Sequence, residues 1–177
     1  IKDAHGWEIT HGVVVPLPVI LYSELDGLVI FSSANFFNEA HQEVPYMGYV
    51  LAHEHISRAD GQSVFDFSIT KNVLFIFIDA AIMLLVFFAV ARGYKKNVGK
   101  APKGVQSLFE PVIIYIRDEV VKPSIGKKYQ KYLPYLLTLF FFIWFGNLLG
   151  LIPGAANMTG NIAVTAVLAL GTFFMTN

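Results

Sequence analysis

Three residues with an ionisable or amide side chain lie within or at the start of long apolar segments. Asp79 is the only charged residue in the apolar run 72–91, and Asn147 lies in the charge-free run 132–177. Asn161 opens the last apolar segment of that run. An acid near the middle of a membrane helix costs about 2.5–3.5 kcal/mol on insertion scales, so Asp79 is a functional candidate by default. These residue types suit a polar path for an ion through a membrane.

Each of these residues also has a structural interpretation. Asp79 would lie about 10 Å below the outer end of its helix, where it could reach the interface or pair with another helix. Asn161 and Thr165 are spaced i, i+4, and both side chains could hydrogen-bond a neighbouring helix. Asn147, between Gly146 and Gly150, should face protein or water rather than lipid.

A second pair of polar residues lies on a predicted amphipathic helix over 104–126. Apolar residues there recur at i, i+3 and i+4 spacing, whereas Glu110, Arg117, Asp118 and Glu119 interrupt the pattern and prevent the segment from spanning a membrane comfortably. Gln106 and Glu110 are four residues apart and share a face. They are candidates for a specific contact at the membrane interface, or simply a solvated pair. We expect Pro111 to bend this helix.

All five histidines lie in the first 55 residues, and His53-Glu54-His55 suggests metal binding. On a strand, the i, i+2 spacing would place both rings on one face. No third ligand is fixed by spacing, and the pattern is not the helical i, i+4 zinc motif. A polar surface segment explains the residues equally, so no metal site and no cofactor is predicted.

The composition indicates the elements that position these residues. The chain has 177 residues, 55% of them apolar, with a mean hydropathy of +0.55, which is typical of a membrane protein. We predict an all-α polytopic membrane protein with a small mixed or β-containing extramembrane N-terminal region. The predicted segments are an acidic region 1–70, a first transmembrane helix 71–92, a basic loop with the interfacial helix 93–131, a second transmembrane helix 132–153, an outer turn 154–160, and the start of a third transmembrane helix 161–177.

The charges give these segments a direction. Residues 1–71 carry nine acidic and three basic side chains, whereas residues 72–177 carry four acidic and ten basic ones. By the positive-inside rule the basic loop after the first helix is cytoplasmic, so the acidic region lies outside. For a bacterial protein this is a multi-pass inner-membrane location with a periplasmic N-terminal region.

The N-terminal region contains no run of membrane length. Short β-like runs at 13–15, 28–31 and 47–51 alternate with turn residues, which predicts two or three short strands. The chain opens without a methionine and its last apolar run, 162–175, is too short to span, so we expect a partial sequence.

The second half of the chain resembles subunit a of the F-type ATP synthase. The resemblance rests on an ordered set of segments: FSITKNV before the first helix, Gln106-x-x-x-Glu110, LLTLFFFIWFGNLLGLIPG, and NIAVTAVLAL after a polar turn. It covers residues 64–177, and the acidic N-terminal region resembles the external extension of some bacterial versions, particularly of the Bacteroidetes type.

The resemblance implies a non-catalytic, proton-translocating stator subunit that forms half-channels against a rotating ring of c subunits. The implied partners are the c-ring, the subunit b stator stalk and the lipid bilayer, with no nucleic acid. Asn147 and Asn161 match polar positions of the family, Glu110 matches a recurrent acid, and Asp79 matches no family position. The family's essential arginine lies in a later helix that this chain does not include.

Two other functions are compatible with the sequence. A membrane-embedded metalloenzyme would use the external histidines, and a structural anchor would have no ion path. Nucleotide chemistry is not expected in this chain, because the sequence contains no Gly-rich loop ending in GK[ST].

Overall fold

The computed structural model describes residues 4–10, 13–38, 42–53 and 55–176. The chain divides into two compact units. The strand unit comprises Ile1–Ile76 with Leu149–Asn161, and the helical unit comprises Phe77–Leu148 with Ile162–Asn177. The N-terminal region consists of small antiparallel sheets and the C-terminal region is helical, as the sequence predicts.

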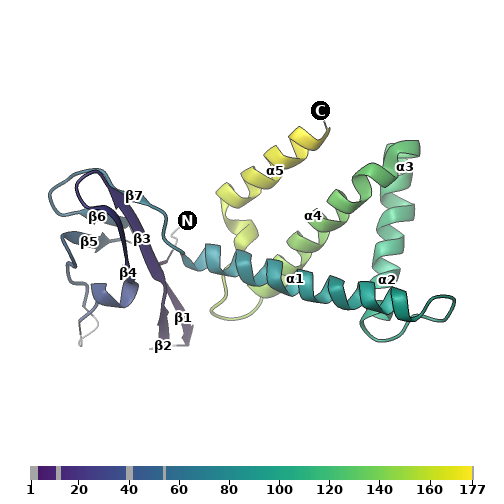
Figure 1. Ribbon diagram of the computed structural model, residues 1–177, viewed down its shortest axis with the longest axis horizontal. Helices are drawn as coiled ribbons and strands as arrows, with labels where there is room; N and C mark the ends of the chain where they lie inside the picture. Colours follow the sequence, from purple (N-terminus) through teal and green to yellow (C-terminus); the bar gives the residue numbers. More distant parts are fainter. Residues whose placement is uncertain (1–3, 11–12, 39–41, 54, 177) are drawn as a thin grey trace. The chain divides into compact units, whose positions relative to one another are not determined.

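The strand unit contains more strands than the two or three expected from the sequence (Figure 1). The strands are β1 (Gly6–Thr10), β2 (Val13–Pro16), β3 (Pro18–Ser23), β4 (Gly27–Ser32), β5 (Tyr49–Ala52), β6 (His55–Arg58) and β7 (Phe65–Asp66). They form the antiparallel sheets β1-β2, β4-β3-β7 and β5-β6. The expected count was wrong because β6 and β7 are short and polar, and carry no apolar run.

A small apolar core holds the strand unit together. Val19 and Leu21, two residues apart on β3, are fully buried and pack with Phe36 and Tyr49. The hydroxyl of Tyr49 donates to Asp26 Oδ2 at 2.8 Å in the turn between β3 and β4. Burying each large apolar side chain contributes about 1.5–3 kcal/mol, so this cluster is the main source of stability for the sheets.

The helices are α1 (Lys71–Lys96), α2 (Val105–Tyr115), α3 (Lys122–Ile125), α4 (Tyr129–Gly150) and α5 (Ile162–Thr176). Helix α1 extends four residues beyond the predicted end at 92 and includes part of the basic segment. Pro111 does not end α2, and a π-helical turn, Ile116–Val121, joins α2 to α3. Gly126, with φ +68°, ends α3.

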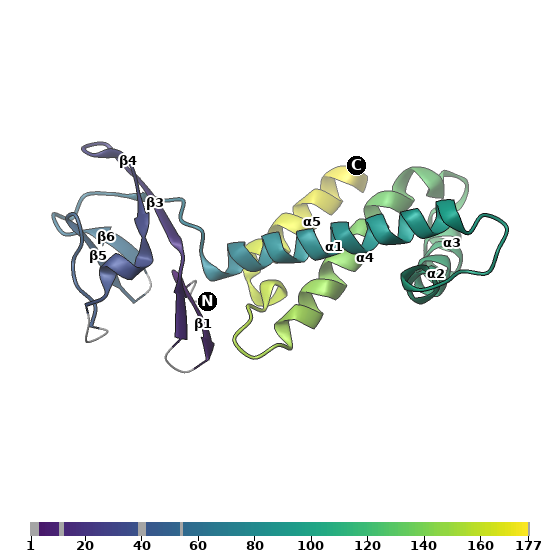
Figure 2. The same ribbon diagram turned by 60° about the horizontal axis from the view of Figure 1, so that its bottom comes forward.

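Aromatic side chains form the core of the helical unit. Phe109 of α2 contacts Phe87 of α1 and Phe141 of α4, with ring centroids 6.0 and 5.8 Å apart. Phe141 and Phe145, one turn apart on α4, are buried in the same cluster. Figures 1 and 2 both show α2 crossing the end of α1 rather than running beside it. The amphipathic helix therefore packs crosswise on the longer helices.

The start of α1 and the loop after α4 belong to the strand unit. Trp7 of β1 packs edge-on against Phe75 at a centroid distance of 5.2 Å. The Trp7 indole N–H also donates to the carbonyl of Gly154 at 2.8 Å. Met158 and Ala156 of the same loop are buried beside Phe75. Strand β1 is thereby joined to two segments that are distant in sequence.

Candidate functional site

Asp79 is fully buried on α1. Among the described residues neither of its carboxylate oxygens has a hydrogen-bond partner. It precedes Ile82, Met83 and Val86 by three, four and seven residues, so it shares their helical face, which packs on the aromatic cluster. A carboxylate in such a place needs a proton, a cation or water to stabilise it. Its burial distinguishes Asp79 from an acid at the membrane interface.

Asn147 lies on the opposite side of α4 from the aromatic cluster. It is two residues after the buried Phe145, which corresponds to about 200° around the helix. Its side chain is exposed, whereas the preceding Gly146 is buried. Asn147 therefore lies on an exposed side of α4.

Asn161 is half-buried and immediately precedes α5. Its backbone N–H donates to the carbonyl of Met158 at 3.1 Å and closes the short 3₁₀ turn Met158–Gly160. The side chain of Asn157 caps the same turn by accepting from the N–H of Gly160 at 3.2 Å. Asn161 belongs to the strand unit, whereas Asp79 and Asn147 belong to the helical unit.

Gln106 and Glu110 are joined by a hydrogen bond, from Gln106 Nε2 to Glu110 Oε2 at 3.0 Å. Gln106 is only 4% exposed, so it is not the solvated residue that one interpretation of the sequence required. Its Oε1 accepts from Asn97 Nδ2 at 2.9 Å. A Cβ added at Gly93 would lie 3.0 Å from Gln106 Cβ, which shows how closely α1 and α2 approach there.

Only part of this polar junction could be predicted from the sequence. The junction is formed by Gly93, Asn97, Gln106 and Glu110. The i, i+4 spacing of Gln106 and Glu110 predicts their common face. Asn97 lies in a turn after α1, where no periodicity indicates which way its side chain points. Gly93 could have been noticed only as a small residue within a helix that packs closely.

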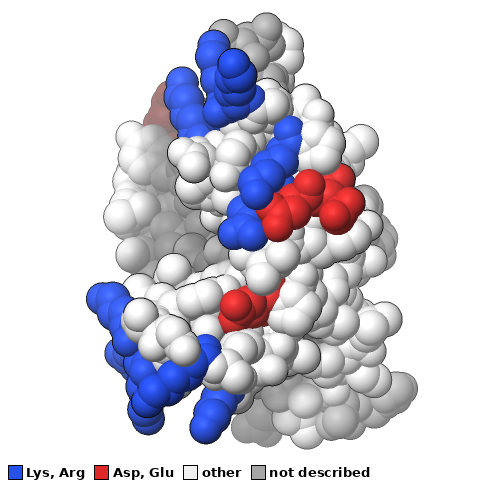
Figure 3. Space-filling view, turned by 90° about the vertical axis from the view of Figure 1, so that its right-hand side faces the viewer, with Lys and Arg blue, Asp and Glu red and all other residues white. Residues whose placement is uncertain are grey.

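An ion-pair group in the π-helical turn is a further feature that the sequence analysis missed. Arg117 donates twice to Asp118, at 2.9 and 2.8 Å, and Lys122 Nζ pairs with the same carboxylate. Figure 3 views the side of the molecule that carries the loop between α1 and α2, where groups of Lys and Arg flank acidic side chains. These pairs provide partners for charges that the amphipathic helix carries near the membrane.

The histidine pair does not have the geometry expected for it. His53 has a φ of +50° and lies in the turn between β5 and β6, whereas His55 begins β6. The two rings therefore do not lie on one continuous strand, which was the condition for a shared face, because the turn breaks the alternation. His11, His41 and Glu54 lie outside the described residues. Within the described ranges no group of three or more His, Cys, Asp or Glu side chains could hold a metal ion.

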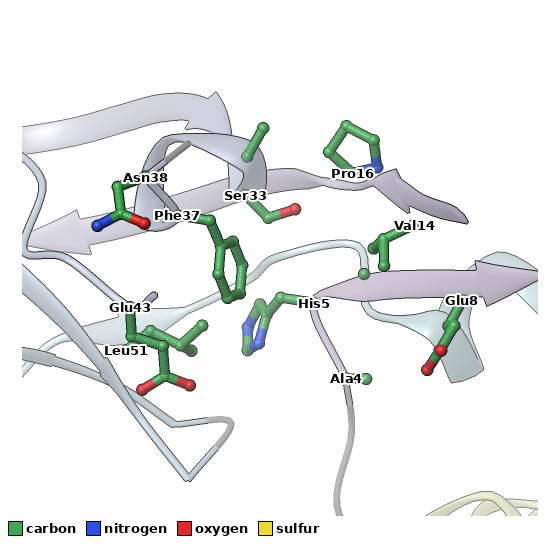
Figure 4. Close-up of a pocket in the computed structure, with 12 residues that line it drawn as sticks. Ala4, His5, Glu8, Val14, Pro16, Ser33, Phe37, Asn38, Glu43 and Leu51 are labelled. Carbon is green, nitrogen blue, oxygen red and sulfur yellow. The ribbon is translucent and has the colours of Figure 1, made fainter. Parts of the chain in front are cut away.

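The strand unit also contains an external pocket of about 560 Å³ (Figure 4). The His5 ring lies among the lining side chains, with Phe37 and Leu51 on one side and Glu8 on the other. His5 Nε2 is 3.0 Å from Asp66 Oδ2, whereas Nδ1 is buried with no partner among the described residues. Because Nδ1 is sealed from solvent, a ligand in this pocket would not reach it without a rearrangement.

The helices of the chain indicate the class of protein to which it belongs. Two helical stretches, Lys71–Lys96 and Val105–Gly150, are long and apolar enough to cross a membrane. Helix α5 is a further, shorter apolar helix. Together with the buried acid on α1, they indicate a helical membrane protein with an additional strand-rich region.

The comparison with known sequences gives the family. Residues 73–177 match the family described as ATP synthase A chain, and because this match covers more than half of the chain, the chain belongs to that family. Residues 1–74 match a family described only as a domain of unknown function. The boundary between the two matches coincides with the start of α1.

Individual relatives agree with this assignment. The chain is 49% identical over 113 residues to an ATP synthase subunit a of Chloroherpeton thalassium, covering 63% of this chain and 34% of the relative. A subunit a of an Anaeromyxobacter species is 39% identical over 142 residues, covering 72% and 34% of the two chains. The chain thus spans about a third of the length of these relatives. No solved structure matches the chain significantly.

Proposed function

We propose that this protein forms part of the proton-translocating stator of a rotary ATP synthase. The observation that carries the proposal is the match of residues 73–177 to the ATP synthase A chain family. The role is non-catalytic: the chain provides polar positions along a membrane path, while nucleotide chemistry belongs to partner subunits. The ring of c subunits and the stator stalk subunit b are the partners that the family resemblance implies.

The proposed orientation follows from the charge distribution. The loop after α1 and the segment before α4 are basic, and the N-terminal region is acidic. The positive-inside rule then places the basic segments in the cytoplasm and the strand unit outside, which is the periplasm of a bacterial inner membrane. In this orientation α4 crosses outward, and Asn147 and Asn161 lie near the outer surface, where a proton would enter.

In this mechanism Asn147 and Asn161 line the outer half-channel, and Asp79 is a buried proton-accepting group on α1. Arg92 lies in the last turns of α1, after its apolar run 72–91, and neither Arg58 nor Arg117 lies in α1 or α4. The cation that would force a passing ring carboxylate to ionise therefore belongs to a helix other than these two. The polar junction around Gln106 holds the interfacial helix against the inner end of α1.

The test measures ATP-driven proton pumping in inverted membrane vesicles that contain the assembled synthase. Asn147→Leu should lower pumping severalfold without loss of the subunit from the membrane, because the amide is replaced by a side chain that cannot hydrogen-bond. Thr138→Val is the matched control, since it removes an exposed polar group whose hydroxyl bonds only the carbonyl of Pro134 on its own helix. Equal pumping by both variants would support a membrane anchor without a path at this position.

A further inference from the structure

The β1-β2 hairpin presents an apolar surface that the strand unit does not cover. Val13 and Val15 share one face of β2 and are 55% and 37% exposed, whereas Val14, 52% exposed, lies on the other face opposite the exposed Glu8. Ile9 on the paired strand is 43% exposed. Surfaces of this kind on a soluble region mark contacts with another molecule or with lipid.

The hairpin is held beside the end of a membrane helix. A Cβ added at Gly154 would lie 2.9 Å from the carbonyl oxygen of Glu8 and 3.0 Å from that of Ile9, so the loop touches the backbone of β1. The hydrogen bond from Trp7 to Gly154 closes the same contact. Both sides of this contact belong to the strand unit.

The contact also determines where the hairpin lies relative to the membrane surface. Leu151 and Ile152 directly follow the last turn of α4 and are 78% and 55% exposed. Phe75, against which Trp7 packs, lies near the start of α1. These residues mark the points where two apolar helices meet the same membrane surface, so a hairpin bonded to them lies at that surface.

We propose that the β1-β2 hairpin dips into the lipid interface on the outer side of the membrane. Its exposed valines and Ile9 then continue the apolar surface of Leu151 and Ile152, and Trp7 takes the position that tryptophan favours at membrane interfaces. The exposed side chains of β2 carry no charge, although the N-terminal region as a whole is strongly acidic. Contact with lipid removes these apolar side chains from water. Neither solvent nor an acidic protein surface would stabilise them in this way. The inference requires only a membrane protein, not proton transport.

The experiment uses the absence of cysteine from this sequence. Val13→Cys, labelled with an environment-sensitive fluorophore in the protein reconstituted in phosphatidylcholine vesicles, reports quenching by nitroxide on the lipid chain and by aqueous iodide. Leu85→Cys is the lipid control, because Leu85 is 70% exposed on the apolar helix α1. Ala59→Cys, exposed after β6, is the aqueous control.

The proposal expects lipid quenching of the Val13 label within about twofold of the Leu85 label and severalfold above the Ala59 label, with little quenching by iodide. Iodide quenching equal to that at Ala59 would overturn it. Protection from both quenchers would also overturn it, because a second copy or another protein would then cover the hairpin. Val15→Cys, on the same face, is read in the same way should Val13→Cys fail to fold.

Discussion

At the scale of single residues, Asp79 and Asp66 show two opposite ways of placing an acid. Asp79 is fully buried and unpartnered among the described residues. Asp66 of β7 is partly exposed and bonded to His5 and to the N–H of Ser68. A bonded carboxylate stabilises its surroundings, whereas an unpartnered buried one is retained at a cost in stability. The two acids therefore call for different tests.

Replacing Asp79 should separate stability from function. Asp79→Leu removes an unpartnered buried carboxylate, so we expect the protein to become more stable by about 1–3 kcal/mol. If Asp79 accepts protons as proposed, proton pumping should fall severalfold in the same variant, because that group is lost. Thermal unfolding in detergent measures the stability of the variant, and ATP-driven pumping in vesicles measures its function. Unchanged pumping would leave Asp79 only a structural role, and Asp79→Asn, which keeps the shape, controls for repacking.

Asp66 should make the strand unit sensitive to acid. Burial raises the pKa of Asp66, but its hydrogen bonds with His5 and Ser68 outweigh this and hold the pKa below its ordinary value. The carboxylate therefore contributes stability that is present above the unfolded pKa of about 3.9 and is lost as the pH falls through the lower folded pKa.

In Asp66→Asn we expect a lower thermal midpoint at pH 6 and a smaller further loss between pH 6 and pH 3. Unfolding of the purified protein, followed by near-ultraviolet circular dichroism across that range, measures both effects. Glu24→Gln, which neutralises an exposed carboxylate in the same unit, controls for the change in net charge. Parallel pH curves for the wild-type protein and Asp66→Asn would contradict the assignment.

At the scale of elements, the contact between α1 and α2 depends on one glycine. Gln106 is buried and bonded at both ends of its amide, so it has little freedom to move aside for a new methyl group. Phe109, one turn along α2, packs into the aromatic cluster. The amphipathic helix is thus fixed by a polar contact at its start and an apolar contact beyond it.

Gly93→Ala should destabilise the helical unit by about 1–3 kcal/mol, because the added methyl group overlaps Gln106 and outweighs the better helix propensity of alanine. Gly171→Ala is the matched control. A Cβ there would meet Tyr135 Oη at 3.6 Å, an ordinary contact, so alanine should be neutral or slightly stabilising. Equal thermal midpoints for the two variants would show that the close approach at Gly93 does not matter.

At the scale of the whole molecule, the contact between β1 and the loop after α4 joins residues that are 147 positions apart. It links the region of unknown function to the region that matches the ATP synthase A chain. The strand unit therefore includes the loop after α4 as well as the N-terminal strands.

Gly154→Ala tests this contact. Alanine at φ +81° costs about 1–2 kcal/mol of backbone strain, and the new methyl group would also press on the backbone of β1. Gly61→Ala is the matched control, since Gly61 has φ +79° but nothing within 4 Å of its added Cβ. Limited proteolysis should cut the β1-β2 hairpin faster in Gly154→Ala than in Gly61→Ala. Equal rates would show that backbone strain alone is responsible.

The sequence by itself determined the membrane class, the family and the approximate position of each helix. These follow from local signals, since charge-free runs, basic flanks and ordered motifs are properties of neighbouring residues. It also predicted that Gln106 and Glu110 share a face, because helical spacing is local. The spacing of His53 and His55 did not reveal the turn between β5 and β6, since one left-handed residue leaves no mark in the spacing.

Only the tertiary structure decided which distant residues meet. The contacts of Gln106 with Asn97 and of Trp7 with Gly154 depend on side-chain directions and chain paths that no periodicity encodes. The exposure of Asn147 and the complete burial of Asp79 were likewise set by packing, because both occupy apolar helices that look alike in sequence. A polar residue in a membrane helix can be found by reading the chain, but what it faces is determined by the other helices.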